Sequence, residues 1–204
     1  RKWLMIWANL LSAVAVLSLL LVDEKSEVWM IYFISSLLMM LHAVFIPAER
    51  ASIPNITEDN ELLTANALSS ATWSAALCLG ASLGGFVVSA YGVEAAFIIN
   101  AVCFLLGALM YSTLTIPQEP FVPKPGGIWA NTGGNIVDGF RIIFSKPHVS
   151  RIITAKALWA VFGGGLVYML ILIGDEIAFG DLAAGIGILF AARGLGTGLG
   201  PIFA

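Results

Sequence analysis

Residues 95–116, AAFIINAVCFLLGALMYSTLTI, form an uncharged and almost entirely apolar run. A helix that crosses a bilayer needs roughly 20 mostly apolar residues, because each residue covers about 1.5 Å of a hydrocarbon layer about 30 Å thick. Five further runs have comparable length and apolarity: 3–22, 28–46, 67–91, 152–173 and 182–204. A soluble domain of 204 residues cannot bury six such runs. We therefore predict an all-α, polytopic bundle of transmembrane helices, with six spans in this chain.

The composition supports this class and argues against others. Hydrophobic residues make up 59% of the chain and charged residues 11%, and the mean hydropathy is +0.92. The runs are apolar on all sides, whereas the strands of a membrane barrel alternate apolar and polar residues. The net charge of −3 gives no reason to expect nucleic-acid binding. Cys78 and Cys103 lie in apolar runs, and His42 and His148 lack the spacing of metal ligands, so we expect no disulfide, metal or cofactor.

The charged residues between the runs predict the orientation of the spans. Lysine and arginine in short loops near span ends favour the cytoplasmic side. Successive gaps lie on opposite sides of the membrane, so every second gap belongs to the same side. One side, counted with the adjacent span ends, holds Arg1, Lys2, Arg50, Lys124, Arg141, Lys146, Arg151 and Lys156. The other side holds Lys25 together with Asp23, Glu24, Glu27, Glu94, Asp175, Glu176 and Asp181. We therefore place the chain start, the gap 47–66 and the gap 117–150 in the cytoplasm.

The cytoplasmic gap 117–150 divides the runs into two groups. It opens with a proline-rich stretch, PQEPFVPKP, and continues with a helical pattern that has Ile136, Phe140, Ile143 and Phe144 on one face. Such a pattern is typical of an amphipathic helix at the membrane surface. We predict three parts: four spans over 1–116, a connector over 117–150, and two spans over 151–204. At the earlier gap, we expect Pro47 to end the second span.

Small residues indicate where helices approach closely. Residues 80–85, GASLGG, lie in the third run, and the sixth run contains Gly185, Gly187, Gly194, Gly196, Gly198 and Gly200. Small residues four apart let two membrane helices pack backbone to backbone. We therefore expect these helices to meet close neighbours, through Gly80, Gly84, Gly85, Gly194 and Gly198. Static packing and a sliding interface fit the pattern about equally well.

Six residues are candidates for lining a substrate pathway. Tyr32, Ser36 and Met40 recur at helical spacing in the second run, where ordinary packing is the plainer interpretation. The other candidates are Trp73, Trp159 and Arg193. Arg193 is the one charge deep within a run, and burying a charge there costs at least about 2.5–3.5 kcal/mol. Its partner is then a substrate anion or a group elsewhere in a longer chain; alternatively, the glycines shift the helix so that Arg193 reaches water.

Four stretches resemble the major facilitator superfamily of membrane transporters. PAERASIP at 47–54, ANALSSATW at 65–73 and LGASLGG at 79–85 are similar to its fourth and fifth spans, and DGFRIIFSKP at 138–147 is similar to the turn before its seventh. Within the superfamily they resemble the bacterial exporter branch with enterobactin-type siderophore and macrolide exporters. The resemblance covers essentially the whole chain and makes the visible runs spans three to eight of twelve. The chain also begins at Arg1 and stops within a run at Ala204, so we expect a fragment of a longer protein.

The resemblance implies a secondary active transporter in the bacterial cytoplasmic membrane. It implies export of an amphipathic small molecule, drug-like or siderophore-like, by alternating access of two six-helix halves, with proton coupling as a family expectation. Gly80, Gly84 and Gly85 resemble the antiporter motif of the fifth span, with Ala81 where that motif has proline. We expect no enzymatic activity and a monomer when full length. The alternatives are a membrane-embedded enzyme, which needs a catalytic pair at bilayer depth, and a non-transporting receptor or scaffold of the same fold.

Overall fold

A computed structural model describes residues 1–58, 60–117, 128–177 and 182–199, and these residues are almost entirely helical. The helices are α1 (Lys2–Ser18), α2 (Val28–Ile56), α3 (Leu62–Thr113), α4 (Ile128–Ser145), α5 (Pro147–Ile177) and α6 (Leu182–Leu199). Two single-turn helices, η1 (Leu19–Leu21) and η2 (Lys25–Glu27), lie between α1 and α2. No strand occurs in the described ranges. The prediction of an all-α fold is confirmed.

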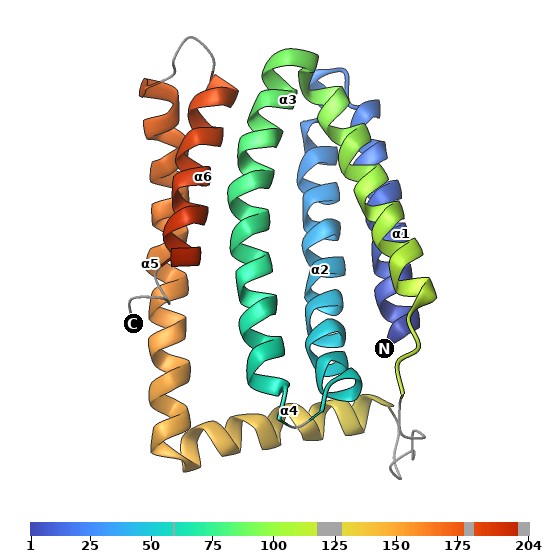
Figure 1. The fold of residues 1–204 in the computed structure, drawn as a ribbon, viewed down its shortest axis with the longest axis vertical. Helices are drawn as coiled ribbons and strands as arrows, with labels where there is room; N and C mark the ends of the chain where they lie inside the picture. Colours follow the sequence, from blue (N-terminus) through green and yellow to red (C-terminus); the bar gives the residue numbers. More distant parts are fainter. Residues whose placement is uncertain (59, 118–127, 178–181, 200–204) are drawn as a thin grey trace. The chain divides into compact units, whose positions relative to one another are not determined.

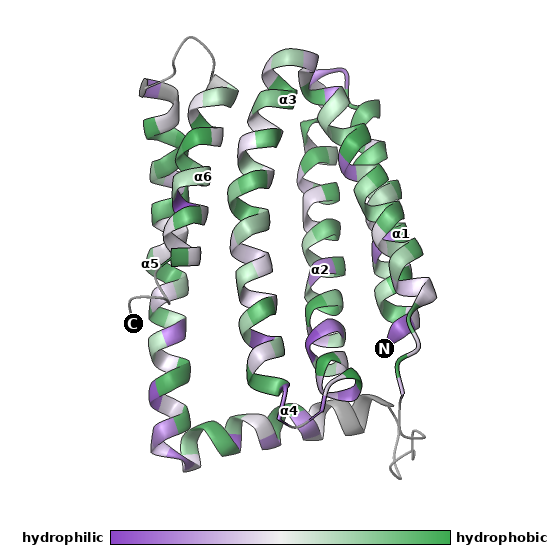
Figure 2. Cartoon of the chain, in the orientation of Figure 1, coloured by the Kyte–Doolittle hydropathy of each residue, from purple (hydrophilic) through white to green (hydrophobic). Residues whose placement is uncertain are grey.

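Four helical segments have the length and apolarity of membrane spans. They are Lys2–Leu21, Lys25–Ile56, Leu62–Thr113 and Pro147–Gly174, and Ala183–Leu199 is a shorter apolar helix. The segment Leu62–Thr113 contains the predicted run 67–91 and all but the last three residues of the run 95–116. The last residues of the sixth predicted run, 200–204, lie outside the described residues. In Figure 2, where the ribbon is coloured by hydropathy, hydrophobic residues make up most of each of these helices.

Helix α3 is a hairpin of two helical arms joined at Gly92. The helical pattern runs from Leu62 to Thr113, but Gly92 has φ 85° and ψ 172°. This conformation is essentially restricted to glycine, because a Cβ would collide with the backbone. Figure 1 shows the chain turning back at one end of α3, so that its two arms run in opposite directions. The short gap predicted at 92–94 is therefore a sharp reversal at one residue.

The prediction that Pro47 ends the second span is wrong. Both Pro47 and Pro54 lie inside α2, which continues to Ile56 and ends where Thr57 is extended. A proline inside a helix removes one N–H donor and favours a kink, and a long helix continues when its other hydrogen bonds remain. The first arm of α3 likewise starts at Leu62 rather than at 67. Apolarity marks where a helix lies in the bilayer, whereas both helices extend beyond their apolar stretches.

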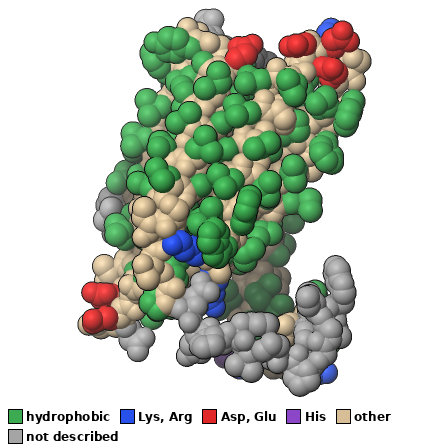
Figure 3. Space-filling model, turned by 90° about the vertical axis from the view of Figure 1, so that its right-hand side faces the viewer, with side chains coloured by type: hydrophobic (Ala, Val, Ile, Leu, Met, Phe, Trp, Pro, Cys, Tyr) green, Lys and Arg blue, Asp and Glu red, His purple; other side chains and the backbone are tan. Residues whose placement is uncertain are grey.

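The chain forms two compact units, one of Arg1–Gln118 with Gly174–Ala204 and one of Glu119–Ile173. In the first unit, α1 packs against α2 and α3, and α3 packs against α6. The buried apolar side chains of this unit are mostly on α1, with Met5 and Val16 the most enclosed. Figure 3 shows one face of the molecule, where a broad band of hydrophobic side chains lies between charged groups. Such a face suits contact with lipid or with further helices.

Two basic side chains bind the carboxyl ends of neighbouring helices in the first unit. The Arg1 guanidinium donates to the carbonyl oxygen of Ala51 at 2.6 Å, near the end of α2. The Lys2 ammonium donates to the carbonyl oxygen of Ser112 at 2.7 Å, at the end of α3. The Ser112 carbonyl is among the last four of α3, which lack partners within the helix, and the carboxyl end of each helix carries partial negative charge. The start of α1 therefore stabilises the same ends of α2 and α3.

The second unit contains α4 and most of α5. Helix α4 includes the predicted amphipathic pattern, and Phe140 and Phe144 are exposed. Arg141 forms an ion pair with Asp138 at 3.4 Å, one helical turn away on α4. The proline-rich part of the connector, 118–127, lies outside the described residues. Helix α5 runs without a break through Gly163, Gly164 and Gly165.

Candidate functional site

The closest helix contact in the first unit joins the first arm of α3 to α6. A Cβ added to Gly194 would lie 2.5 Å from the backbone nitrogen of Cys78 and 2.6 Å from its Cα. A Cβ added to Gly85 would lie 2.7 Å from the carbonyl oxygen of Ala183, and one added to Gly198 would lie 3.3 Å from the Cβ of Ser74. The distances at Gly194 and Gly85 leave no room for a side chain, whereas a side chain at Gly198 requires its neighbour to shift by only a few tenths of an ångström. The two helices therefore touch through their backbones.

The partners along this contact show that the two helices are antiparallel. Residues with increasing numbers on α6, from Ala183 to Gly198, meet residues with decreasing numbers on α3, from Gly85 to Ser74. Gly187 belongs to the same face of α6, because its added Cβ would lie 3.0 Å from the carbonyl oxygen of Ala81. Close antiparallel approach of this kind is typical of small residues in membrane helices.

The predicted packing glycines do not all lie on this contact. Gly85, Gly194 and Gly198 are part of it, whereas a Cβ added to Gly80 or Gly84 would meet no atom within 4 Å. Gly187, which belongs to the small-residue pattern of the sixth run but not to the five glycines singled out, also lies on this contact. Near the start of α6, a Cβ on Gly174 of α5 would lie 2.8 Å from a side-chain carbon of Ile186. The end of α5 thus also approaches α6 closely.

Arg193 lies on α6 beside the α3–α6 contact. Its guanidinium carbon is 6.0 Å from the centroid of the Phe190 ring, and its side chain is partly exposed. Within the described ranges, neither a hydrogen bond nor an ion pair involves this guanidinium. Counting from Leu182 at about 1.5 Å per residue, Arg193 lies about 16 Å along α6. That distance is about half the thickness of a bilayer core.

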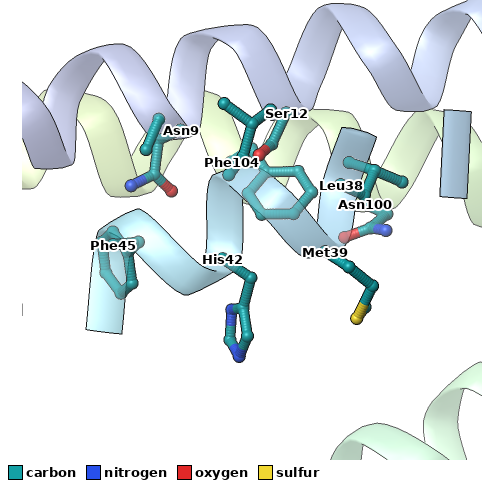
Figure 4. Close-up of a pocket in the computed structure, with 10 residues that line it drawn as sticks. Asn9, Ser12, Leu38, Met39, His42, Phe45, Asn100 and Phe104 are labelled. Atoms are coloured by element: carbon teal, nitrogen blue, oxygen red, sulfur yellow. The ribbon is translucent and has the colours of Figure 1, made fainter. Parts of the chain in front are cut away.

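A pocket of about 400 Å³ opens between α1, α2 and the second arm of α3. Figure 4 shows its labelled side chains: Asn9, Ser12, Leu38, Met39, His42, Phe45, Asn100 and Phe104. Its wall is mainly apolar, with a few polar groups contributed by each of the three helices. Pockets of this size with few polar groups are common sites for small molecules.

The polar side chains of the pocket differ in how they are held. The Asn9 amide is buried and donates to the carbonyl oxygen of Met5 at 2.8 Å. Its oxygen faces Gly107 of α3, where an added Cβ would lie 3.1 Å away. His42 and Asn100 are exposed and have no hydrogen-bond partner in the described part of the chain. Asn9 therefore joins α1 to α3, while His42 and Asn100 are free to meet a ligand or another helix.

The remaining lining candidates lie on three different helices. Tyr32, Ser36 and Met40 share one face of α2 and are exposed, and the Ser36 hydroxyl donates to the carbonyl oxygen of Tyr32 at 2.7 Å. Trp73 on α3 and Trp159 on α5 are also exposed. Among the described residues, no hydrogen bond or ring contact joins these side chains to one another. None of them lines the pocket beside α1.

Comparison with known proteins identifies the family. A model described as the Major Facilitator Superfamily matches residues 1–204. The chain belongs to the major facilitator superfamily. Its apolar helices make it a multi-pass membrane protein of that superfamily.

The curated relatives of this superfamily chain are bacterial. It is similar to the uncharacterized MFS-type transporter YfiS of Bacillus subtilis (strain 168), with 26% identity over 149 residues, 72% of this chain and 34% of the relative. It is also similar to the uncharacterized MFS-type transporter YkuC of the same organism, with 22% identity over 130 residues, 61% of this chain and 30% of the relative. The chain spans about a third of the length of these relatives. No solved structure matches it.

The two amide side chains that line the pocket of this superfamily member, Asn9 and Asn100, were missed by sequence reasoning. Asn9 and Asn100 are the amide side chains that interrupt the first and fourth runs, and a polar residue within an apolar run is a signal for a functional or packing role. Sequence reasoning applied that signal to Arg193 but not to these two amides. The contact of Asn9 with Gly107 depends on which faces of two distant helices meet, and the apolar pattern does not specify this.

Proposed function

We propose that this chain is part of a secondary active transporter that exports amphipathic small molecules by alternating access. Its family membership supports transport in general, and the resemblance of 47–54, 65–73, 79–85 and 138–147 to exporters supports the direction. Under this proposal, the visible helices are spans three to eight of twelve. The parts 1–116 and 151–204 belong to different six-helix halves, joined by a cytoplasmic connector at 117–150. The protein acts as a monomer in the bacterial cytoplasmic membrane, with protons as the proposed coupling ion.

The observation that carries the proposal is the contact between α3 and α6. Under the proposed numbering, the first arm of α3 is span five and α6 is span eight, one from each half. The contact consists of backbone atoms and small residues, with Gly194 against Cys78 and Gly85 against Ala183. Interfaces without interlocking side chains offer little resistance to sliding or rocking. Alternating access in this superfamily requires motion of this kind between two halves.

The proposed pathway uses exposed side chains of mixed character. Tyr32, Ser36 and Met40 form one face of α2, and aromatic and methionine side chains accept ligands of varied shape. Trp73, Trp159 and Arg193 are the remaining lining residues of the proposal. The site binds its substrate reversibly, and no residue is assigned a catalytic role.

A reversible cross-link tests whether the α3–α6 contact must move. In the full-length protein without its native cysteines, Ser74→Cys and Gly198→Cys place two thiols opposite each other. The Cβ separation at this pair is 3.3 Å, close to the 3.5–4.5 Å found in disulfides. Oxidation is expected to stop efflux of a fluorescent amphiphile from proteoliposomes, and reduction to restore it. The two single variants, treated with the same oxidant, are the controls.

Two outcomes contradict the proposal. Efflux that continues at the full rate in the cross-linked protein shows that transport does not require motion at this contact. A wild-type protein that binds amphiphiles but produces no flux under an ion gradient is a receptor or scaffold rather than a transporter.

A further inference from the structure

We propose that Arg193 binds the anionic group of the transported molecule, so that the substrate is an amphipathic anion such as an aryl carboxylate. This inference rests on the proposed transport function and specifies its substrate class. It follows from the charge balance around Arg193, from the shape of α6 beside it, and from the contact of its guanidinium with an aromatic ring.

The first observation is an uncompensated charge. The packed helices α3 and α6 contain no aspartate or glutamate between Leu62 and Val93 or between Leu182 and Leu199. Arg193 is therefore the single charge in this helix pair over those ranges. An unpaired guanidinium at bilayer depth is costly, and it persists when it meets an anion or a water-filled cavity. The paired helix confirms the depth, because Gly194 meets Cys78, which lies near the middle of the first arm of α3.

The second observation concerns the two faces of α6. One face carries Gly187, Gly194 and Gly198, which pack on the backbone of α3. Arg193 lies beside that face, and Gly196 follows it by three residues, which places the two side by side on the helix surface. A Cβ added to Gly196 would meet no atom within 4 Å. The missing side chain at Gly196 leaves open space beside Arg193 on the helix surface.

The third observation is the aromatic neighbour. The Phe190 ring lies 6.0 Å from the guanidinium carbon, at the edge of cation–π range. This ring presents an apolar surface beside a positive charge. A molecule with a carboxylate attached to an aromatic or aliphatic body matches both, because the planar guanidinium binds carboxylates through two parallel hydrogen bonds. Neutral amphiphiles gain only the apolar part of this contact.

A matched pair of probes tests the inference in the full-length protein in phosphatidylcholine nanodiscs. Pyrenebutyrate carries the carboxylate, and its N-methylamide has the same apolar body without the charge. The wild-type protein is expected to bind the carboxylate about tenfold more tightly than the amide, as for one charge-assisted hydrogen bond. Arg193→Gln is expected to abolish this preference and leave amide binding unchanged.

Two further variants keep the test decisive if Arg193→Gln does not fold. Arg193→Lys keeps the charge without the fork of donors and is expected to retain part of the preference. Gly196→Leu keeps the guanidinium but fills the space beside it, and is expected to weaken carboxylate binding about tenfold. Gly196→Ala, with a small side chain in open space, is the matched control and should bind like the wild type.

Some results overturn the inference. Equal binding of the two probes by the wild type excludes an anion site. So does an equal loss of both probes in Arg193→Gln together with a lower unfolding temperature, because that pattern shows a structural ion pair with another part of the protein. The transport proposal fails separately from this inference. Preference for the carboxylate without flux supports the anion site and contradicts the transport function. Flux of both probes without preference supports the transport function and contradicts the anion site.

Discussion

The backbone contact between α3 and α6 predicts a large effect from adding a single methyl group. In Gly194→Ala, the new Cβ would lie 2.5 Å from the backbone nitrogen of Cys78, about 0.9 Å short of the 3.4 Å at which ordinary contact begins. The nearest atoms are backbone, so no side-chain rotation relieves the overlap. The helices must separate by about this distance, and overpacking of this kind costs about 1–3 kcal/mol.

Gly196→Ala is the matched control for this prediction. The same substitution occurs two residues away on the same helix, but its Cβ meets no atom within 4 Å. Alanine favours a helix over glycine by up to about 1 kcal/mol, and both variants share this gain. The difference in unfolding free energy between the two variants therefore isolates the contact, at about 1–3 kcal/mol. Gly194→Ala is expected to be the less stable.

Thermal unfolding of the purified full-length protein, followed by intrinsic fluorescence, measures this difference. The reasoning is refuted if both variants unfold at the same temperature, because α3 and α6 then do not approach as closely as the structure indicates. A second variant sharpens the result. Adding Cys78→Gly to Gly194→Ala removes the Cβ of Cys78, which lies 2.8 Å from the new Cβ of residue 194. The backbone nitrogen and Cα of residue 78 remain, at 2.5 and 2.6 Å from it. It should restore little stability, and full restoration would contradict a backbone contact.

Three further predictions concern the turn, the orientation and the helix ends. Gly92→Ala is expected to lower the free energy of unfolding by about 1–3 kcal/mol, because φ 85° with ψ 172° suits only glycine. Gly80→Ala, on an open helix surface, is the control and should not lower it. Equal unfolding temperatures of the two variants would contradict the hairpin geometry. In a cysteine-free background, a membrane-impermeant maleimide added to intact cells should label Ser26→Cys and spare Ser145→Cys, and the opposite pattern would invert the proposed topology. Lys2→Met should cost about 0.3–1 kcal/mol through loss of the bond to the end of α3, and an unchanged unfolding curve would show that this bond contributes nothing.

The apolar pattern predicts the number and class of the helices better than their ends. Runs without charge locate the segments at bilayer depth, because lipid excludes charged side chains. They do not show that α2 continues past Pro47 to Ile56, since that depends on hydrogen bonds beyond the apolar stretch. Gly92 is the opposite case. A glycine next to Glu94 between two apolar runs indicates a turn, and the structure places the reversal at that residue.

The glycines show which part of the candidate site was open to prediction. Their density in the third and sixth runs predicts close packing of two helices, and α3 and α6 do pack. Which glycines take part depends on how each helix is rotated toward the other. Gly194 faces α3, while Gly196 lies on another side of the same helix. The rotation of each helix about its axis depends on a partner helix that is distant in the sequence. For the same reason, the contact of Asn9 with Gly107 could not be predicted from the sequence.

The bonds made by Arg1 and Lys2 depend on how many times the chain crosses the membrane between the two partners. Arg1 reaches Ala51 across two membrane crossings, and Lys2 reaches Ser112 across four. Each bond requires an even number of crossings between its two ends, so a failed or extra insertion within α1 or α2 prevents both bonds, whereas one within the two arms of α3 prevents only the Lys2 bond. Ala51 leaves the ribosome before Ser112. The Arg1 bond can therefore form once the first two crossings are correct, before the Lys2 bond forms across all four.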